Sequence, residues 1–183
     1  MPPKPRLNVQ TFPRPPLLEK TPRHLIVKYR DQTIAETKDA YWVLETYHSP
    51  TYYLPVTSLS PNFPLTPSAT AKATFCEYKG WATYYSISLP APFSPSPSSS
   101  CPFSDQLTSP EPQKHEIANR IWSYESPTSR YEALKGYISF YVGPWDCFVD
   151  GEKVIPQPGD FYGGWTTSEL DGIIKGSAET RWM

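Results

Sequence analysis

Apolar and polar residues alternate with a period of two along much of the chain, the pattern of β-strands with one buried face. The clearest hairpin surrounds Asp150-Gly151, because this dipeptide supplies the positive φ angles that a type I′ turn requires. One helical turn is expected at residues 131–135, and the glycine-rich residues after 155 are expected to form loops. The predicted strands are 25–30, 33–37, 41–47, 52–56, 73–78, 81–89, 115–124, 137–142, 147–149 and 152–155.

Two proline-rich segments interrupt this pattern. The chain contains 23 prolines in 183 residues, well above the usual share of about 5%. Residues 1–22 hold seven of them, so we expect an extended or disordered arm unless this segment lies along the domain surface. Residues 90–112 combine seven prolines with seven serines, a composition that predicts a flexible insertion. The insertion serves as a linker or, alternatively, as a target for phosphorylation at its Ser-Pro steps.

The length of 183 residues fits one domain. Aromatic residues make up 15% of the chain, and together with the prolines they favour sheet and turns over helix bundles. We therefore expect a mostly β fold with short helical turns only. The predicted organisation is an N-terminal arm at 1–22 and a single β domain at 23–183 that carries the flexible Ser/Pro insertion at 90–114.

Charge and cysteine content exclude several classes of protein. A net charge of −1 argues against nucleic acid as a partner. No apolar stretch approaches 18 residues, which argues against a membrane span, and the first ten residues do not resemble a signal peptide. Three widely spaced cysteines without a CxxC pair indicate reduced thiols and exclude ordinary zinc ribbons. A metal site through His and carboxylates is the open alternative, but no ligand spacing favours it, and we expect no cofactor. We expect a cytoplasmic protein, with the nucleus as the alternative.

Eight short segments follow one another along the chain: TIAET at 33–37, VLE at 43–45, YYLP at 52–55, TFCEYKG at 74–80, ATY at 82–84, IWSY at 121–124, GYISFY at 136–141 and VDGE at 149–152. In this order they resemble the family catalogued as domain of unknown function 427. Glu77 departs from the pattern, since bacterial members usually have proline after the cysteine. The ending, from Pro158 to Trp165 with Lys175-Gly176 after it, resembles an extension of fungal members.

The resemblance implies a compact domain in which two antiparallel sheets pack at an angle around a central, polar-lined pocket. It implies no established activity, although a nucleotidyltransferase-type label accompanies the family. The sequence gives this label little support, because it has neither Gly-Ser followed by paired Asp-x-Asp nor a phosphate loop ending in Gly-Lys-Ser/Thr.

Three polar residues are candidates for chemistry. Glu45 lies in an apolar run and is either a general acid or base, a ligand anchor, or a glutamate at the rim of a strand. Cys76 precedes Lys79 by three residues, so an ammonium group nearby favours a reactive thiolate; the alternative is a small buried hydrophobic residue. Lys79 at the Lys79-Gly80 hairpin either holds an anionic ligand or is solvated.

Five aromatic residues are the candidates for the wall of a pocket, because small-molecule sites combine aromatic walls with a few polar groups. The alternative is that these residues only fill the core of a leucine-poor domain. With Glu45 and Lys79 they are expected around one pocket between the sheets, where those two would be the only opposite charges and would pair. The five are Tyr53, Tyr84, Trp122, Tyr124 and Tyr141.

Three functions remain open at this point. The first is a small-molecule-binding domain without turnover, and the second is an enzyme on a small polar or anionic substrate, with Glu45 as acid or base and Lys79 as an electrostatic clamp. The third is a protein-interaction adaptor that uses the proline-rich arm. If substitutions of Glu45 and Lys79 leave ligand binding unchanged, the alternative location is beside Asp160 and Trp165 in the tail.

Overall fold

A computed structural model describes residues 5–89 and 115–180. These residues are mostly strand, with three short 3-10 helices, which confirms the mostly β fold. The helices are η1 (Val9–Thr11), η2 (Val56–Ser58) and η3 (Ser129–Leu134), the last of which covers most of the predicted helical turn. The described part of the chain contains no helix long and apolar enough to cross a membrane.

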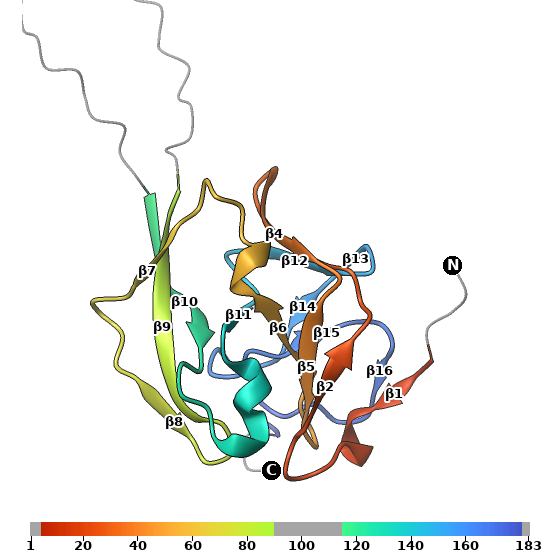
Figure 1. Cartoon of the computed structure of the whole chain (residues 1–183). Coiled ribbons are helices and arrows are strands. Elements are labelled where there is room, and N and C mark those ends of the chain that lie inside the picture. Colours follow the sequence, from red (N-terminus) through yellow and green to blue (C-terminus); the bar gives the residue numbers. More distant parts are fainter. Residues whose placement is uncertain (1–4, 90–114, 181–183) are drawn as a thin grey trace, which may run out of the picture.

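The larger sheet is antiparallel and has the strand order β2-β5-β6-β11-β10-β9-β7, with β8 paired to the edge of β9 (Figure 1). At its centre, Ile121 of β10 lies opposite Phe140 of the next strand, β11, and Ile138 of β11 lies opposite Leu54 of β6, a strand distant in sequence. The strands are β2 (Leu17–Thr21), β5 (Ala40–Leu44), β6 (Thr51–Pro55), β7 (Leu65–Pro67), β8 (Thr74–Cys76), β9 (Gly80–Leu89), β10 (His115–Ser123) and β11 (Tyr137–Phe140).

A smaller antiparallel sheet has the order β13-β12-β3-β4. It contains the two hairpins that the sequence predicted most directly, and in the β12–β13 turn Asp150 and Gly151 both have positive φ. Its strands are β3 (Leu25–Tyr29), β4 (Gln32–Thr37), β12 (Asp146–Val149) and β13 (Glu152–Lys153).

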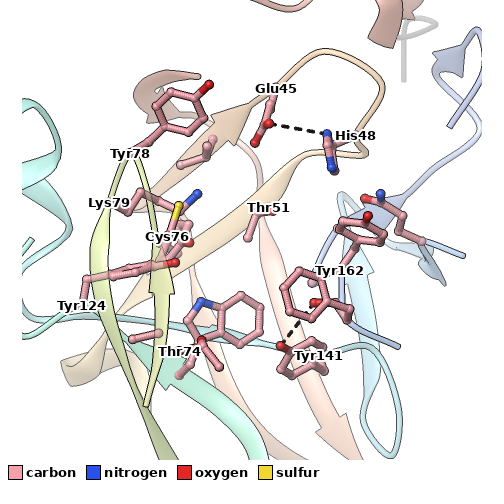
Figure 2. Close-up of a pocket in the computed structure, with 18 of the residues that line it drawn as sticks. Glu45, His48, Thr51, Thr74, Cys76, Tyr78, Lys79, Tyr124, Tyr141 and Tyr162 are labelled. Carbon is pink, nitrogen blue, oxygen red and sulfur yellow. Dashed lines mark hydrogen bonds and ion pairs between the residues drawn. The ribbon is translucent and has the colours of Figure 1, made fainter. Parts of the chain in front are cut away.

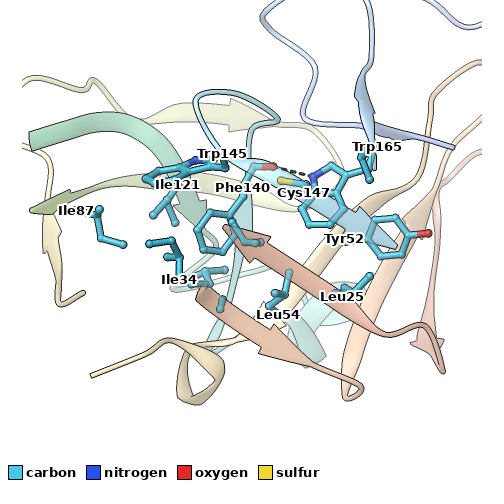
Figure 3. Close-up of a cluster of buried hydrophobic side chains, with 14 of the residues drawn as sticks. Leu25, Ile34, Tyr52, Leu54, Ile87, Ile121, Phe140, Trp145, Cys147 and Trp165 are labelled. Carbon is cyan, nitrogen blue, oxygen red and sulfur yellow. Dashed lines mark hydrogen bonds between the residues drawn. The ribbon is translucent and has the colours of Figure 1, made fainter. Parts of the chain in front are cut away.

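The main hydrophobic core joins the two sheets. Leu25 and Cys147 from the smaller sheet pack with Leu54 and Phe140 from the larger one, and all four are fully buried (Figure 3). Along β6 and β10, alternate side chains enter this core, while those between them point to the other face of the larger sheet. The period-two pattern therefore separates a core face from a second face on the same strands.

The segment expected as an N-terminal arm contributes strands to the fold from residue 7 onward. β1 (Leu7–Asn8) pairs in parallel with β16 (Leu170–Asp171), and β2 forms the edge of the larger sheet beside β5. Val9 and Phe12 are buried against Leu44 in a separate small core. The prolines at 13, 15 and 16 fall between β1 and β2, where they remove no ladder hydrogen bond.

The tail, expected as loop, is tied into the fold by short strands. β14 (Ile155–Pro156) pairs with β15 (Trp165–Thr166), and Trp165 is completely buried. Its indole N–H donates to the Phe140 carbonyl at 2.9 Å. Arg23 of the β2–β3 connection also reaches the tail, because it pairs with Glu169 at 2.5 Å. The predicted flexibility of the 90–114 insertion concerns residues outside the described ranges.

The two described cysteines have different surroundings. Cys147 is fully buried, and burial raises the pKa of its thiol, whereas Cys76 is half-buried; both are free thiols. In a Cys101→Ser variant we expect Ellman's reagent to modify Cys76 in the native protein and Cys147 only after unfolding, because the thiolate is the reactive form. Fast modification of both thiols in the native protein, or of neither, would contradict these environments.

Candidate functional site

A cavity of about 560 Å³ opens on the face of the larger sheet opposite the main core. The structure therefore places it outside the space between the two sheets, where we expected it, because core side chains fill that space. All of the candidate residues nevertheless line this one cavity, and Figure 2 shows several of them pointing into it. These eight are Glu45, Tyr53, Cys76, Lys79, Tyr84, Trp122, Tyr124 and Tyr141.

Aromatic side chains from β6 and β10 form the floor of the cavity. Tyr53 is fully buried, with its ring centroid 6.3 Å from those of both Trp122 and Tyr124. Trp122 packs in turn against Tyr141, at 4.5 Å between centroids. The Trp122 indole and the Tyr124 hydroxyl both act to lower the pKa of Tyr53, so this largely apolar floor also carries polar groups.

The phenols of this floor are neutral. Burial is the main cause that raises the pKa values of Tyr53, Tyr124 and Tyr141 above the usual value for tyrosine. Tyr141 also interacts with Tyr84, whose hydroxyl lies 2.9 Å from Thr74 Oγ1. At physiological pH these hydroxyl groups keep their protons and remain able to donate hydrogen bonds.

Lys79, a largely buried residue, brings its amino group to the cavity. It lies in the turn between β8 and β9, where the Thr128 N–H donates to the Lys79 carbonyl at 3.2 Å. Gly80 has a φ of +99° and approaches the Ser126 carbonyl closely, so this turn docks against residues 126–128. The Lys79 side chain is 9% exposed, and its Nζ lies 5.8 Å from the Tyr124 ring centroid. Within the described ranges it has neither an ion pair nor a side-chain hydrogen bond.

Glu45 does not pair with Lys79, and this part of the prediction is wrong. Strand β5 ends at Leu44, so Glu45 lies in the following turn, with Oε1 3.4 Å from Arg14 Nε and 3.9 Å from His48 Nδ1. The two candidates are also not the only opposite charges at the cavity, since Arg14, Glu77 and Lys175 line it too. The N-terminal segment and the tail supply two of these charges.

His48 is a lining residue that sequence reasoning left unplaced. Its Nδ1 lies 2.9 Å from the Thr46 carbonyl oxygen, and its ring meets Tyr162 edge-on at 5.1 Å between centroids. Burial is the largest cause that lowers the pKa of His48 below its usual 6.5; Glu45 opposes this shift, while Lys175 and Arg14 add to it. His48 is therefore an uncharged imidazole at neutral pH.

The tail forms the wall that faces the β8–β9 turn, and sequence reasoning missed most of it. A Cβ atom at Gly163 would lie 2.0 Å from the Trp122 indole, so only glycine lets the tail approach this closely. The sequence feature that could have indicated this wall is the Gly163-Gly164 pair, which lies in a run of aromatic residues. Asp160 and Trp165, named as the alternative location, do not line the cavity; Asp160 pairs with Arg120 and Trp165 fills the core. The tail residues that do are Gln157, Phe161, Tyr162, Gly163, Gly164 and Lys175.

Metal ligands do not gather in the described part of the chain, where no group of three His, Cys, Asp or Glu side chains is close enough to hold an ion. No curated protein matches the chain. Residues 17–151 match the family model NTP_transf_9, a domain of unknown function (DUF427). This match confirms the resemblance seen in eight segments and begins before residue 23, in agreement with the position of β2. The chain belongs to the domain of unknown function 427 family.

Proposed function

We propose that the cavity binds a small, planar organic molecule that carries a negative charge. The observation that carries this proposal is Lys79, a largely buried residue whose amino group lines the cavity beside the Tyr124 ring, with no carboxylate partner in the described part of the chain. A cation in a partly enclosed site pairs strongly with an anion, and an anionic group of a ligand would supply the counter-charge that the described residues do not.

The rest of the cavity supports the same class of ligand. A volume of about 560 Å³ lies within the usual range of small-molecule sites, roughly 300–1,000 Å³. Tyr53, Trp122 and Tyr124 offer ring faces to a planar body and hydroxyl or indole donors to its polar edge. These features support a ligand with an aromatic or conjugated body and one acidic group.

The nucleotidyltransferase-type label receives less support. Phosphoryl-transfer sites use carboxylates that hold Mg²⁺ and a backbone cradle for phosphates. Glu45 and Glu77 are the only acidic side chains among the described lining residues, and Glu45 is already paired with Arg14. The chain also has no Gly-Lys-Ser/Thr loop. An enzyme acting on a small polar or anionic substrate remains the second candidate, and the observation that favours it is His48 beside Glu45.

The test compares 2-naphthoate with its neutral amide, 2-naphthamide, in calorimetric titrations. We expect the carboxylate to bind at least about tenfold more tightly, and Lys79→Met to remove this preference, because the ammonium group attracts only the charged probe. Lys38→Met changes an exposed lysine and is the control that keeps wild-type binding. Equal binding of the two probes, or unchanged binding by Lys79→Met, would refute the proposal.

A thermal melt of the same variants separates binding from stability. Because Lys79→Met removes no ion pair or side-chain hydrogen bond of the described residues and keeps most of the side-chain volume, we expect a melting temperature at or above that of the wild type. A lower melting temperature together with lost binding would show that Lys79 serves the fold. Loss of binding without loss of stability is the result that supports a ligand site.

A further inference from the structure

The hydrogen bond of His48 fixes the state of its imidazole ring. The Thr46 carbonyl oxygen only accepts, so Nδ1, which lies 2.9 Å away, carries the proton and donates it. In a neutral ring the other nitrogen, Nε2, then has a free lone pair. Figure 2 shows Glu45 joined to the Nδ1 side of the ring, so Nε2 lies on the side away from Glu45.

The groups around His48 suit a residue that accepts a proton and then releases it. His48 lines the cavity and is largely buried, and its uncharged form prevails at neutral pH. The Glu45 carboxylate, 3.9 Å from Nδ1, stabilises the positive charge that appears when Nε2 takes up a proton. Lys175 and Arg14 act in the opposite direction and favour release. A buried histidine oriented by a carbonyl and backed by a carboxylate is the arrangement of a general base.

We propose that His48 is the general base of this pocket and activates water for the hydrolysis of an acyl ester whose acid group is held by Lys79. This inference rests on the proposed function, because it assumes that an anionic molecule occupies the cavity. It assigns the role of base to His48 and leaves Glu45 as the residue that stabilises the charged ring.

The proposed step balances without a further reagent. Nε2 removes a proton from water while the water oxygen forms a bond to the acyl carbon, which gives a tetrahedral intermediate. The bond from that carbon to the leaving oxygen then breaks, and the Nε2 proton moves to the leaving oxygen. The products are a carboxylic acid and an alcohol, and His48 returns to its neutral form with Nδ1 still donating to Thr46.

The test uses two esters, neutral 4-nitrophenyl acetate and anionic 4-acetoxybenzoate. We expect His48→Gln to slow hydrolysis of both by about 100-fold or more, within the usual contribution of general-base catalysis. His24→Gln is the matched control, since His24 pairs with Glu36 on the surface and should keep the wild-type rate. Wild-type protein without hydrolytic activity, or a His48→Gln variant as active as His24→Gln, would overturn the inference.

Lys79→Met makes failure of this inference distinguishable from failure of the proposed function. We expect it to lower the ratio of the 4-acetoxybenzoate rate to the 4-nitrophenyl acetate rate at least about tenfold, because only the first probe carries a charge. If Lys79→Met changes neither rate while His48→Gln abolishes both, the base is correct and the anion site is wrong. If 2-naphthoate binding depends on Lys79 but no ester is cleaved, the anion site is correct and the base is wrong.

The pH profile and the tautomer provide readouts that a structural role for His48 would not produce. The rate should rise with pH through a midpoint below 6.5, because the neutral form is active and the pKa of His48 is lowered. Glu45→Gln should move this midpoint to lower pH, since the carboxylate raises the pKa. Nitrogen-15 spectra at pH 7 should show His48 protonated at Nδ1 alone. A charged ring, or a proton on Nε2, would refute the assignment.

Discussion

Replacing Trp165 with alanine is expected to lower the free energy of unfolding by about 3–5 kcal/mol, the usual cost of truncating a buried tryptophan. Trp165 is 0% exposed and packs against Tyr52, with 5.2 Å between ring centroids. Its loss would leave a large cavity in the main core and would remove the hydrogen bond from its indole N–H to the Phe140 carbonyl. Urea denaturation followed by circular dichroism measures the change.

Phe161→Ala is the matched control for this experiment. Phe161 lies four residues before Trp165 in the same tail, but its side chain is 74% exposed. Its carbonyl accepts the Tyr141 hydroxyl proton and is retained in alanine, so we expect a change within about 0.5 kcal/mol. If Trp165→Ala costs no more than Phe161→Ala, the tail is not part of the core, and the cavity wall that it forms would also be in doubt.

The stability contribution of Trp165 bears on the boundary of the domain. The family match ends at residue 151, yet β15 and the buried Trp165 follow it. Residues 157–164, between the matched region and Trp165, include the wall residues that face Lys79 across the cavity. The burial of Trp165 therefore fixes the position of a wall built from residues outside the matched region.

Local patterns predicted the sheets because strand formation depends on neighbouring residues. Alternation identified both hairpins of the smaller sheet, and Asp150-Gly151 has the backbone angles that its chemistry demands. Aromatic character, together with the family resemblance, selected Tyr53 and Trp122, which lie on one face of the larger sheet. The residues of the aromatic floor could therefore be named from the sequence and the resemblance.

The charges around the floor could not be predicted in the same way. Arg14 and Lys175 are more than 150 positions apart in the sequence, and only long-range packing brings both to one cavity. The prolines near Arg14 suggested an arm outside the domain, whereas Val9 and Phe12 anchor that segment against Leu44. Pairing of Glu45 was mispredicted because β5 ends at Leu44, three residues before the predicted end of this strand, and Glu45 in the turn that follows lies beside Arg14 and His48.

The cavity thus combines parts with different origins. The central strands of the larger sheet form its floor. Lys79 comes from the turn before β9, and the tail forms the wall that faces this turn. The tail lies against the floor at Gly163, where an added Cβ would be 2.0 Å from the Trp122 indole. This contact sets how near the tail comes to the aromatic floor, and hence the width of the cavity.

Gly163→Ala is expected to destabilise the protein by about 1–3 kcal/mol, the usual cost of overpacking, and to weaken 2-naphthoate binding. An added Cβ would lie 2.0 Å from Cη2 of Trp122, so the tail or the indole must move and the cavity must change shape. Trp122→Phe in the same chain removes the atoms that clash. In a double-mutant cycle, we expect the double variant to lose less free energy of unfolding than the sum of the losses in the two single variants. Additive costs, with 2-naphthoate binding unchanged in Gly163→Ala, would show that this contact sets neither the packing nor the width of the cavity.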